Sequence, residues 1–167
     1  MEWFNKMADM QPEDIQDSLD LWKAQNNIMG AAYDALLHSD TDAFLQFDFD
    51  IRHGISTIIH AMESASYLPK GTIVWRAVPV NSTTLSKNPE KFMSVSATKE
   101  GALHFANGRA MRICEIEIGD DGIQGMPIRS KDDLLDAEDE IIIRPGFKVS
   151  MITCAESGAT VYKITKA

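Results

Sequence analysis

The sequence predicts an α+β protein, with an N-terminal helical layer packed on a mostly antiparallel, twisted β sheet or pair of sheets. Two observations predict this class. Apolar residues recur at helical spacing before residue 68, and short segments rich in β-branched residues, separated by turns, follow from residue 70. A chain of 167 residues is long enough for a sizeable core. We therefore expect one domain over residues 1–167, with a helical region at residues 1–68 and a β-rich region at residues 70–167.

The clearest helical pattern lies near the end of the helical region. Its apolar residues fall at i, i+4, i+7, i+8 and i+11, which places them on one helix face (Ile51, Ile55, Ile58, Ile59 and Met62). Earlier in the chain, Pro12 is followed by acids, as is typical of a helix N-terminus, and an apolar side continues to Trp22. The stretch "NIMGAAYDALLHSD" predicts a further helix.

Six segments after residue 70 have the texture of strands. They read "TIVWRAVPV", "KFMSVSA", "MRICEIEI", "DEIIIRP", "FKVSMITC" and "ATVYKITK". The loop "AESG" between the last two suits a hairpin. One helix interrupts the series, because Thr98 can cap "KEGALHFA" and Asn107-Gly108 can end it.

Composition narrows the classes of function. The net charge of −9 argues against general binding of nucleic acid or acidic membranes, although one or two local cations could still hold a small anion. No apolar run approaches the roughly 18 residues that cross a bilayer, and the acidic start is unlike a signal peptide. We expect a soluble, cytoplasmic protein. Cys114 and Cys154 are expected to be reduced there, although a disulfide stays possible.

Two polar features lie in predicted strands with apolar neighbours. Arg76 follows Ile73, Val74 and Trp75, and it is either an edge arginine that reaches solvent or a rigid fork for a phosphate or carboxylate. Ser94 and Ser96 share one face of their strand, which by itself is typical of an exposed face.

The third feature is an acidic pair beside three isoleucines, in "LLDAEDEIIIRPG". On a strand, Glu138 and Glu140 point the same way and lie about 7 Å apart. The simplest explanation is a solvated strand entrance, and the alternative is a pair of working carboxylates. His53 and His60 lie off the helical stripe without a partner at metal-ligand spacing, so we expect surface or hydrogen-bonded histidines and no metal site.

Common catalytic motifs do not match. His104 is the nearest base for a serine nucleophile, and no Gly-x-Ser-x-Gly surrounds Ser94 or Ser96. The sequence also has no Walker loop, Gly-x-Gly-x-x-Gly, His-Glu-x-x-His or Cys-x-x-Cys. Metal-free chemistry by carboxylates and hydrogen bonds remains.

In order along the chain, "VWRA", "FMSVSAT" and "EDE" resemble the arginine, Ser-x-Ser and Glu-x-Glu motifs of arginine-directed mono-ADP-ribosyltransferases. The small enzymes that T-even bacteriophages use on host proteins are most similar, through "WRAVP" and "SVSATKEGALHFANG". The resemblance covers about residues 70–150, and no motif of the helical half takes part in it. Three weak motifs in the right order on predicted strands, with the helix as well, form a specific pattern.

The resemblance implies an ADP-ribosyltransferase-like fold, with a twisted, mostly antiparallel β core of two packed sheets, and an NAD site. Arg76 matches the arginine that contacts the dinucleotide phosphates, and Ala77 matches the position whose backbone holds the nicotinamide amide. Ser94 matches the serine that orients the catalytic glutamate, while Ser96 is more of a scaffold. Phe105 matches the helix aromatic that stacks on nicotinamide, although helix aromatics equally often pack in a core.

Glu140 matches the catalytic glutamate and Glu138 the one that prepares the acceptor arginine. This division makes chemical sense, because a carboxylate can stabilise the ribosyl cation while a second one draws a proton from a guanidinium of pKa above ~12. Two departures from the family pattern stand out. The loop "RSKDDLLDA" lacks an aromatic, for which Leu134 or Leu135 could substitute, and Arg109 lies next to the place of a phosphate-binding arginine.

The resulting expectation is an NAD-dependent enzyme that transfers ADP-ribose to an arginine of a target protein of a bacterial host, such as its transcription or translation machinery. NAD glycohydrolysis is the alternative within the enzyme class. A non-catalytic acidic binding protein or mimic is the alternative outside it, and it would need acids spread over one face rather than a convergence of Arg76, Ser94 and Glu140. The target, the oligomeric state and the role of the N-terminal helices are not predicted.

Overall fold

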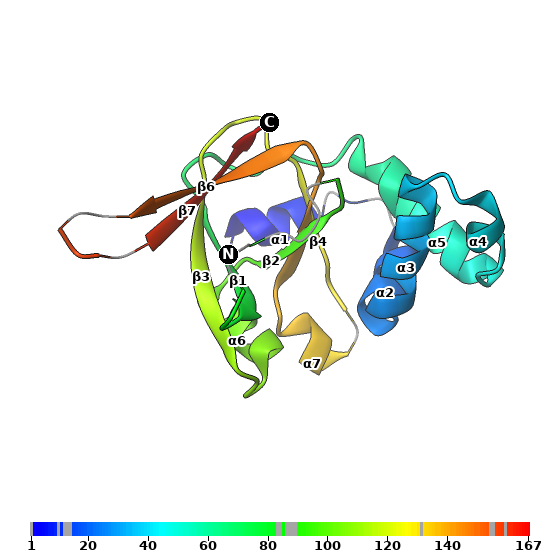
Figure 1. The fold of residues 1–167 in the computed structure, drawn as a ribbon, viewed down its shortest axis with the longest axis horizontal. Coiled ribbons are helices and arrows are strands. Elements are labelled where there is room, and N and C mark those ends of the chain that lie inside the picture. The colour runs from blue at the N-terminus through cyan, green and yellow to red at the C-terminus, as the bar shows by residue number, and fades with distance from the viewer. Residues whose placement is uncertain are drawn as a thin grey trace.

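The computed structural model places the N-terminal helices beside a twisted sheet (Figure 1). It describes residues 2–9, 11, 15–82, 85, 90–130, 132–153, 156–158 and 160–167. The expected helix start at Pro12, the thiol of Cys154 and a portion of the "AESG" turn lie outside the described residues. Among the helices of the described residues, none has both the length and the apolar character that crossing a membrane requires.

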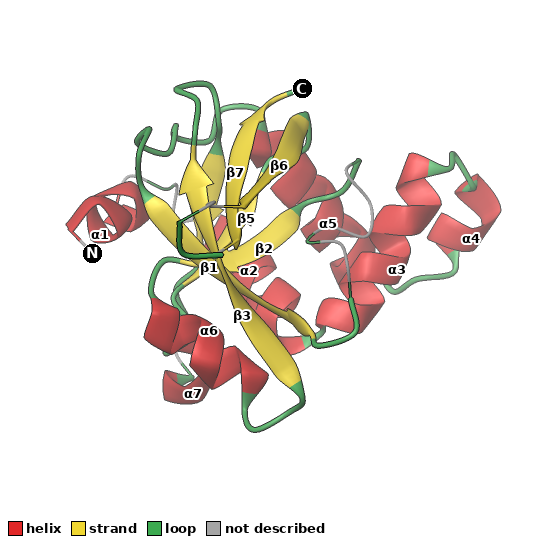
Figure 2. Cartoon of the chain, turned by 60° about the vertical axis from the view of Figure 1, so that its left-hand side comes forward, coloured by secondary structure: helices red, strands yellow, loops and turns green. Residues whose placement is uncertain are grey.

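Five helices precede the first strand within the described residues. They are α1 (Glu2–Asp9), α2 (Gln16–Ala24), α3 (Asn26–Leu37), α4 (Thr41–Leu45) and α5 (Phe49–Met62). The short helices α6 (Lys99–Ala106) and α7 (Asp133–Asp136) follow within the β-rich region. Figures 1 and 2 both show α2, α3, α4 and α5 gathered on one side of the sheet, with α6 and α7 side by side at one end of it.

The strands form one twisted sheet in the order β4-β5-β2-β1-β3-β7-β6. Their bounds are β1 (Ile73–Pro79), β2 (Met93–Ser96), β3 (Met111–Ile118), β4 (Gly125–Pro127), β5 (Glu140–Ile143), β6 (Phe147–Thr153) and β7 (Thr160–Lys166). Among the strand pairs of the described residues, β3 and β7 run parallel and the others antiparallel. The sheet is therefore mixed and mostly antiparallel.

The strands belong to one hydrogen-bonded sheet, which is one of the two arrangements that the sequence predicts. Hydrogen bonds run without a break from β4 to β6, because β3 pairs with β1 along one edge and with β7 along the other. The β6–β7 hairpin continues the sheet through the parallel β3–β7 pairing. Phe147 of β6 lies in the same core as Met93 of β2 and Ile143 of β5, so the strongly twisted sheet packs on itself.

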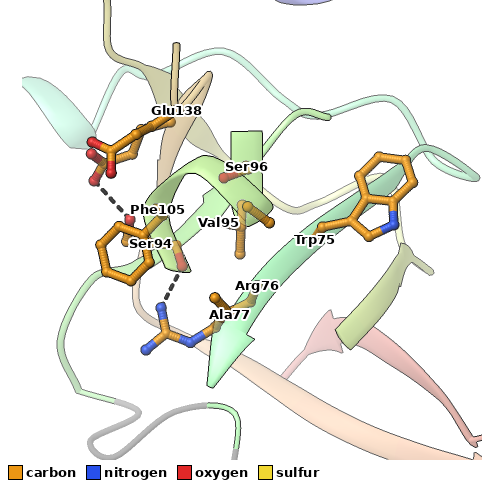
Figure 3. A pocket seen from close by; sticks show the side chains of 10 residues that line it. Trp75, Arg76, Ala77, Ser94, Val95, Ser96, Phe105 and Glu138 are labelled. Carbon is orange, nitrogen blue, oxygen red and sulfur yellow. Dashed lines mark hydrogen bonds between the residues drawn. The ribbon is translucent and has the colours of Figure 1, made fainter. Parts of the chain in front are cut away.

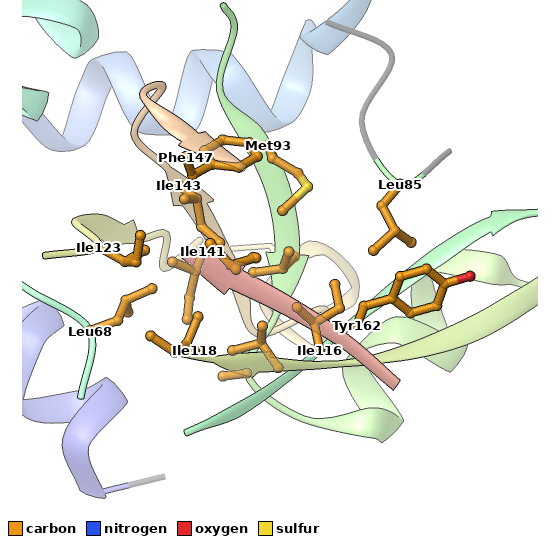
Figure 4. Packing of buried hydrophobic residues seen from close by; sticks show 14 of the residues in the cluster. Leu68, Leu85, Met93, Ile116, Ile118, Ile123, Ile141, Ile143, Phe147 and Tyr162 are labelled. Atoms are coloured by element: carbon orange, nitrogen blue, oxygen red, sulfur yellow. The ribbon is translucent and has the colours of Figure 1, made fainter. Parts of the chain in front are cut away.

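Two apolar cores lie on opposite faces of β5. Ile141 and Ile143 belong to a core that the twisted sheet encloses (Figure 4). Phe4 of α1 belongs to the same core. Ile142 belongs to the other core, with apolar residues of α2, α3 and α5 such as Leu19. A strand buried on both faces needs a continuous apolar run, which explains the three consecutive isoleucines.

The alternation of β5 also decides where Glu140 points. Successive side chains of a strand face opposite ways, so Glu140 shares the face of Ile142 and looks toward the helices α2, α3 and α5. Met93 and Val95 of β2 lie in the core with Ile141, which leaves Ser94 and Ser96 on the face of Glu140. The expected division of β2 into two faces is confirmed.

All six predicted strand segments contain strands of the structure. The elements not predicted are α1, α4, α7 and β4, of which α4, α7 and β4 span three to five residues and therefore show no periodicity. Thr98 caps α6 by accepting a hydrogen bond from the Gly101 amide, and Asn107 ends it in the left-handed conformation, as expected.

Within the part of the chain that the structure describes, the cysteine and histidine side chains considered in the sequence analysis do not line the cleft described below. Cys114 is a buried free thiol of β3. His53 stacks on Phe49, and His60 lies 4.0 Å from Glu63 on the exposed side of α5. Within the described stretches of the chain, no group of three or more His, Cys, Asp or Glu side chains is placed to hold a metal ion.

Candidate active site

Glu140, the first residue of β5, is buried and receives hydrogen bonds from Ser94, Trp22 and Lys23. Ser94 Oγ donates to its Oε2 at 2.7 Å, and Trp22 Nε1 donates to the same oxygen at 3.2 Å. Lys23 Nζ donates to its Oε1 at 2.7 Å. Donors from β2 and α2 thus fix the orientation of this carboxylate from two sides.

Glu138 reaches the same place from a different element than predicted. The expectation that Glu138 and Glu140 share one strand is wrong, because β5 begins at Glu140 and Glu138 lies in the turn after α7. Between them, Asp139 has a φ of 47°, a left-handed conformation that no strand contains. The carboxylates meet nevertheless, since Lys23 Nζ lies 2.6 Å from Glu138 Oε1 and 2.7 Å from Glu140 Oε1.

The turn that bears Glu138 is anchored to α6. Thr98, the capping residue of α6, donates from Oγ1 to Asp139 Oδ2 at 2.7 Å, and the Ala97 amide donates to the Asp139 carbonyl at 2.8 Å. Gly101 in the first turn of α6 lies against the backbone of Glu138. A Cβ at Gly101 would come within 2.3 Å of the Glu138 carbonyl oxygen. The glycine therefore permits the close approach of helix and turn.

Ser94 and Ser96 sit on the strand next to Glu140. Ser96 is the cross-strand partner of Glu140, and Ser94 pairs with Ile142. Ser94 reaches the carboxylate along the diagonal of the antiparallel ladder, a contact within range on one sheet face. Ser96 is buried beside it, so the pair of serines lines the site and is not an exposed face.

Arg76 of β1 braces the backbone around the site. Its Nε donates to the carbonyl of Leu85 at 2.6 Å, and its Nη1 donates to the carbonyl of Ser94 at 2.5 Å (Figure 3). Burial lowers the pKa of Arg76, while attraction to Glu140 acts in the opposite direction. A guanidinium stays protonated at neutral pH even so. Arg76 is thus a half-buried fork that lines the same pocket as the acidic pair and not a solvent-directed edge arginine.

The remaining predicted residues line the same region. Ala77 is buried next to Arg76 in the wall of a small pocket, which both serines and both glutamates also line. Phe105 of α6 is 45% exposed and borders the pocket, so it is not a core residue (Figure 3). The guanidinium of Arg109 lies 4.9 Å from the centre of the Phe105 ring and donates to the Phe105 carbonyl at 2.6 Å.

A cleft of about 390 Å³ opens between the sheet and the helices. Both glutamates, Ser94, Arg76 and Phe105 line it on the side of the sheet. Its other side is formed by residues of α2, α3 and the approach to β2, namely Trp22, Lys23, Asn26, Gly30, Tyr33, Lys91 and Phe92. The volume falls in the range of sites that hold small organic ligands, roughly 300–1,000 Å³.

Trp22 and Lys23 were missed by sequence reasoning. Lys23 is buried, with a side chain that is 2% exposed. Burial alone would lower the pKa of Lys23, but attraction to Glu140 and the hydrogen bonds that Lys23 donates to Glu138 and Glu140 outweigh it and raise the pKa. A signal was present in the sequence, because Lys23 follows the buried Leu19 at i+4 and so falls on the apolar side of α2.

Solved structures establish what kind of fold holds this site. No protein-family model matches the sequence, and no curated protein sequence matches it significantly. An ADP-ribosyltransferase from Clostridium botulinum superposes with a TM-score of 0.61 at 11% identity, over 99% of this chain and 92% of that chain. The chain has the fold of the ADP-ribosyltransferases. The α+β class and the ADP-ribosyltransferase-like architecture expected from the sequence are confirmed.

Two further structures with the ADP-ribosyltransferase fold are similar. An ADP-ribosyltransferase toxin from Paenibacillus larvae superposes with a TM-score of 0.54 at 14% identity, over 98% of this chain and 91% of that chain. Vis toxin, an ADP-ribosyltransferase from Vibrio splendidus, gives 0.52 at 18% identity, over 99% and 80%. Because the likeness covers nearly the whole chain, it includes the N-terminal helices, for which the sequence offered no motif.

Proposed function

We propose that this protein is an NAD-dependent mono-ADP-ribosyltransferase that transfers ADP-ribose to an arginine side chain of a target protein and releases nicotinamide. One observation carries the proposal. Arg76, Ser94 and the pair Glu138 and Glu140 come from three separate segments of the sequence and line one cleft, and Ser94 donates directly to the carboxylate of Glu140. The ADP-ribosyltransferase fold of the chain supports the same reaction class.

Glu140 is suited to the first step. When the bond between the nicotinamide nitrogen and ribose C1′ breaks, the electron pair leaves with nicotinamide and positive charge develops on the ribose. A buried carboxylate held by Ser94 and Trp22 needs little reorganisation to stabilise that charge. We assign Glu140 the catalytic role and Ser94 the role of orienting it.

Glu138 is suited to the second step. A guanidinium is a poor nucleophile while it keeps its proton, because its pKa lies above ~12. Glu138 beside Glu140 can accept that proton as the guanidino nitrogen forms its bond to C1′. The turn geometry supports this division, since Glu138 lies outside β5 and next to α7, where Leu134 is 69% exposed and available to a partner protein.

The cleft offers suitable contacts for NAD as co-substrate. Besides Lys23, the cleft holds the cations Arg76 and Lys91, and a pyrophosphate needs such local cations in a protein of net charge −9. Lys91 is also paired with Asp34 at 2.9 Å. Ala77 borders the smaller pocket, where its backbone could hold the nicotinamide amide, and Ser96 supports that wall. The exposed ring of Phe105 can stack on nicotinamide.

An enzyme fits these observations better than an acidic mimic. A mimic would present its acids on a solvated face, whereas Glu138 and Glu140 turn toward a cleft and share a buried cation. We propose that residues 1–167 act as one domain, in which the helical region at residues 1–68 completes the cleft of the β-rich region at residues 70–167. We also propose a host protein in the bacterial cytoplasm as target, as the similarity to phage enzymes implies.

Transfer of a radioactive label tests the proposal. The protein is incubated with NAD labelled in its adenylate phosphate and with bacterial lysate, and labelled protein bands are sought, with Glu140→Gln as the control. Agmatine, which carries a guanidinium, is compared with 1,5-diaminopentane, which carries only ammonium groups. We expect label on protein and on agmatine, and no label on 1,5-diaminopentane. Labelling of neither, or equal labelling with the Glu140→Gln variant, would refute the proposal.

A further inference from the structure

Lys23 places a positive charge between the two carboxylates to which we assign the chemistry. Its Nζ lies 2.6 Å from Glu138 Oε1 and 2.7 Å from Glu140 Oε1. The neighbouring Trp22 donates to the other oxygen of Glu140, so one turn of α2 contacts both oxygens of that carboxylate. The lysine also lines the 390 Å³ cleft.

A lysine in this place opposes the cleavage step. The ribosyl group gains positive charge beside Glu140, and an ammonium 2.7 Å from the same carboxylate repels that charge and weakens the field that Glu140 provides. Lys23 keeps its proton at neutral pH, since both glutamates favour its charged form. Cleavage therefore favours a state in which Lys23 has left the carboxylates.

An acceptor guanidinium is a suitable replacement for the ammonium. It has the same charge, and its planar fork with five N–H donors can bridge two carboxylates. Water has no charge, so it cannot compensate Glu138 and Glu140 for the loss of Lys23. The long side chain of Lys23 can withdraw into the cleft that it lines, where its charge is solvated.

We propose that Lys23 is a specificity-determining residue that occupies the position of the acceptor cation between Glu138 and Glu140 and thereby selects a cationic acceptor over water. This inference rests on the proposed function. It assigns the N-terminal helix α2 a role in the ratio of transfer to NAD hydrolysis.

The test compares Lys23→Met, which keeps the apolar stem and removes the charge, with wild type. Lys148→Met is the matched control, because Lys148 is an exposed lysine of β6 at the far edge of the sheet. Nicotinamide release is measured without acceptor and with agmatine. We expect Lys23→Met to release nicotinamide without acceptor about tenfold faster than wild type, and to transfer a smaller share of ADP-ribose to agmatine. Lys148→Met should behave as wild type.

Calorimetric titration with agmatine gives a readout that does not depend on turnover. Lys23→Met should bind agmatine about tenfold more tightly than wild type, because no internal cation has to be displaced, and this corresponds to about 1.4 kcal/mol. If thermal unfolding shows that Lys23→Met does not fold, Lys23→Gln takes its place in both experiments. The same faster release of nicotinamide and tighter binding of agmatine are expected.

The two ways of failing are distinct. If wild type releases no nicotinamide even with agmatine, the proposed function is wrong, and the titration still decides whether Lys23 occupies a guanidinium site. If acceptor-free release falls in the folded Lys23 variants and agmatine binds no more tightly, Lys23 merely positions the carboxylates and the inference is overturned.

Discussion

Ser94 and Glu140 lie on neighbouring antiparallel strands, and the serine hydroxyl donates to Oε2 of the glutamate at 2.7 Å. The contact runs diagonally across the ladder, because Ser96 and not Ser94 is the cross-strand partner of Glu140. Met93 and Val95 in the apolar core fix which way β2 faces and therefore fix the serine as well. The orientation of the carboxylate thus depends on the packing of the sheet.

Ser94→Ala tests that orientation. The variant loses a hydrogen bond to a charged group, which is worth about 1.5–3 kcal/mol, so we expect NAD cleavage to fall by roughly tenfold to a hundredfold. Ser82→Ala, just after β1 and outside the residues that line the cleft, is the comparison. Nicotinamide release at saturating NAD is the measurement. A Ser94→Ala variant within twofold of wild type would show that the contact does not position Glu140 for reaction.

Trp22→Phe tests the hydrogen bond that α2 donates to Glu140 through the Trp22 indole. The change removes the indole N–H bond to Glu140 and keeps an aromatic ring to pack on Phe92, whose centre lies 5.9 Å from that of Trp22. We expect roughly tenfold slower NAD cleavage with little change in the unfolding temperature. Trp3→Phe, in α1 against Phe4, should leave the rate unchanged. Equal rates for all three proteins would exclude the indole from the site.

Arg76→Lys tests the brace and the proposed phosphate contact. Lysine keeps the charge but cannot donate to the carbonyls of Leu85 and Ser94 in the same geometry, so β2 should shift beside Glu140. We expect NAD to bind at least about tenfold more weakly by calorimetric titration, a loss of about 1.4 kcal/mol. The comparison is Arg52→Lys, where Arg52 Nε donates to the carbonyl of Phe47. Unchanged NAD affinity in Arg76→Lys would remove Arg76 from the binding site.

Gly101→Ala tests the anchoring of the Glu138 turn to α6. A Cβ would lie 2.3 Å from the Glu138 carbonyl oxygen, a distance that forces the turn or the helix to move. We expect destabilisation by about 1–3 kcal/mol and a loss of transfer to agmatine larger than the loss of NAD cleavage. Gly54→Ala is the control, since its added Cβ would meet only side-chain atoms of Leu21 and Met29 at 3.2 Å or more and Gly54 does not line the cleft. If Gly101→Ala transfers as efficiently as wild type, the turn position is not critical.

Much of the fold could be predicted because its signals are local. The isoleucines of β5 and the alternation of Met93, Ser94 and Val95 identify buried strands, and the helical stripe from Ile51 predicts α5. The expected position of Glu138 was wrong because the two-residue period of the strand was extended back through Asp139. Asp139 has a left-handed conformation that the sequence pattern does not predict.

The contacts of α2 could not be predicted for a different reason. Trp22 and Lys23 precede Glu140 by 118 and 117 residues, and only the packing of the helices on β5 brings them together. A lysine on an apolar helix face predicts a buried partner, but the sequence alone does not say which acid that partner is.

The central claim is that Glu140 drives NAD cleavage and Glu138 serves the acceptor. The most direct test measures nicotinamide release and label transfer to agmatine side by side in wild type, Glu140→Gln and Glu138→Gln. We predict that Glu140→Gln loses both activities by about 100- to 1000-fold, as removal of one preorganised electrostatic group does, while Glu138→Gln loses transfer but still releases nicotinamide. A folded Glu140→Gln variant that keeps both activities within a few-fold of wild type would contradict the claim.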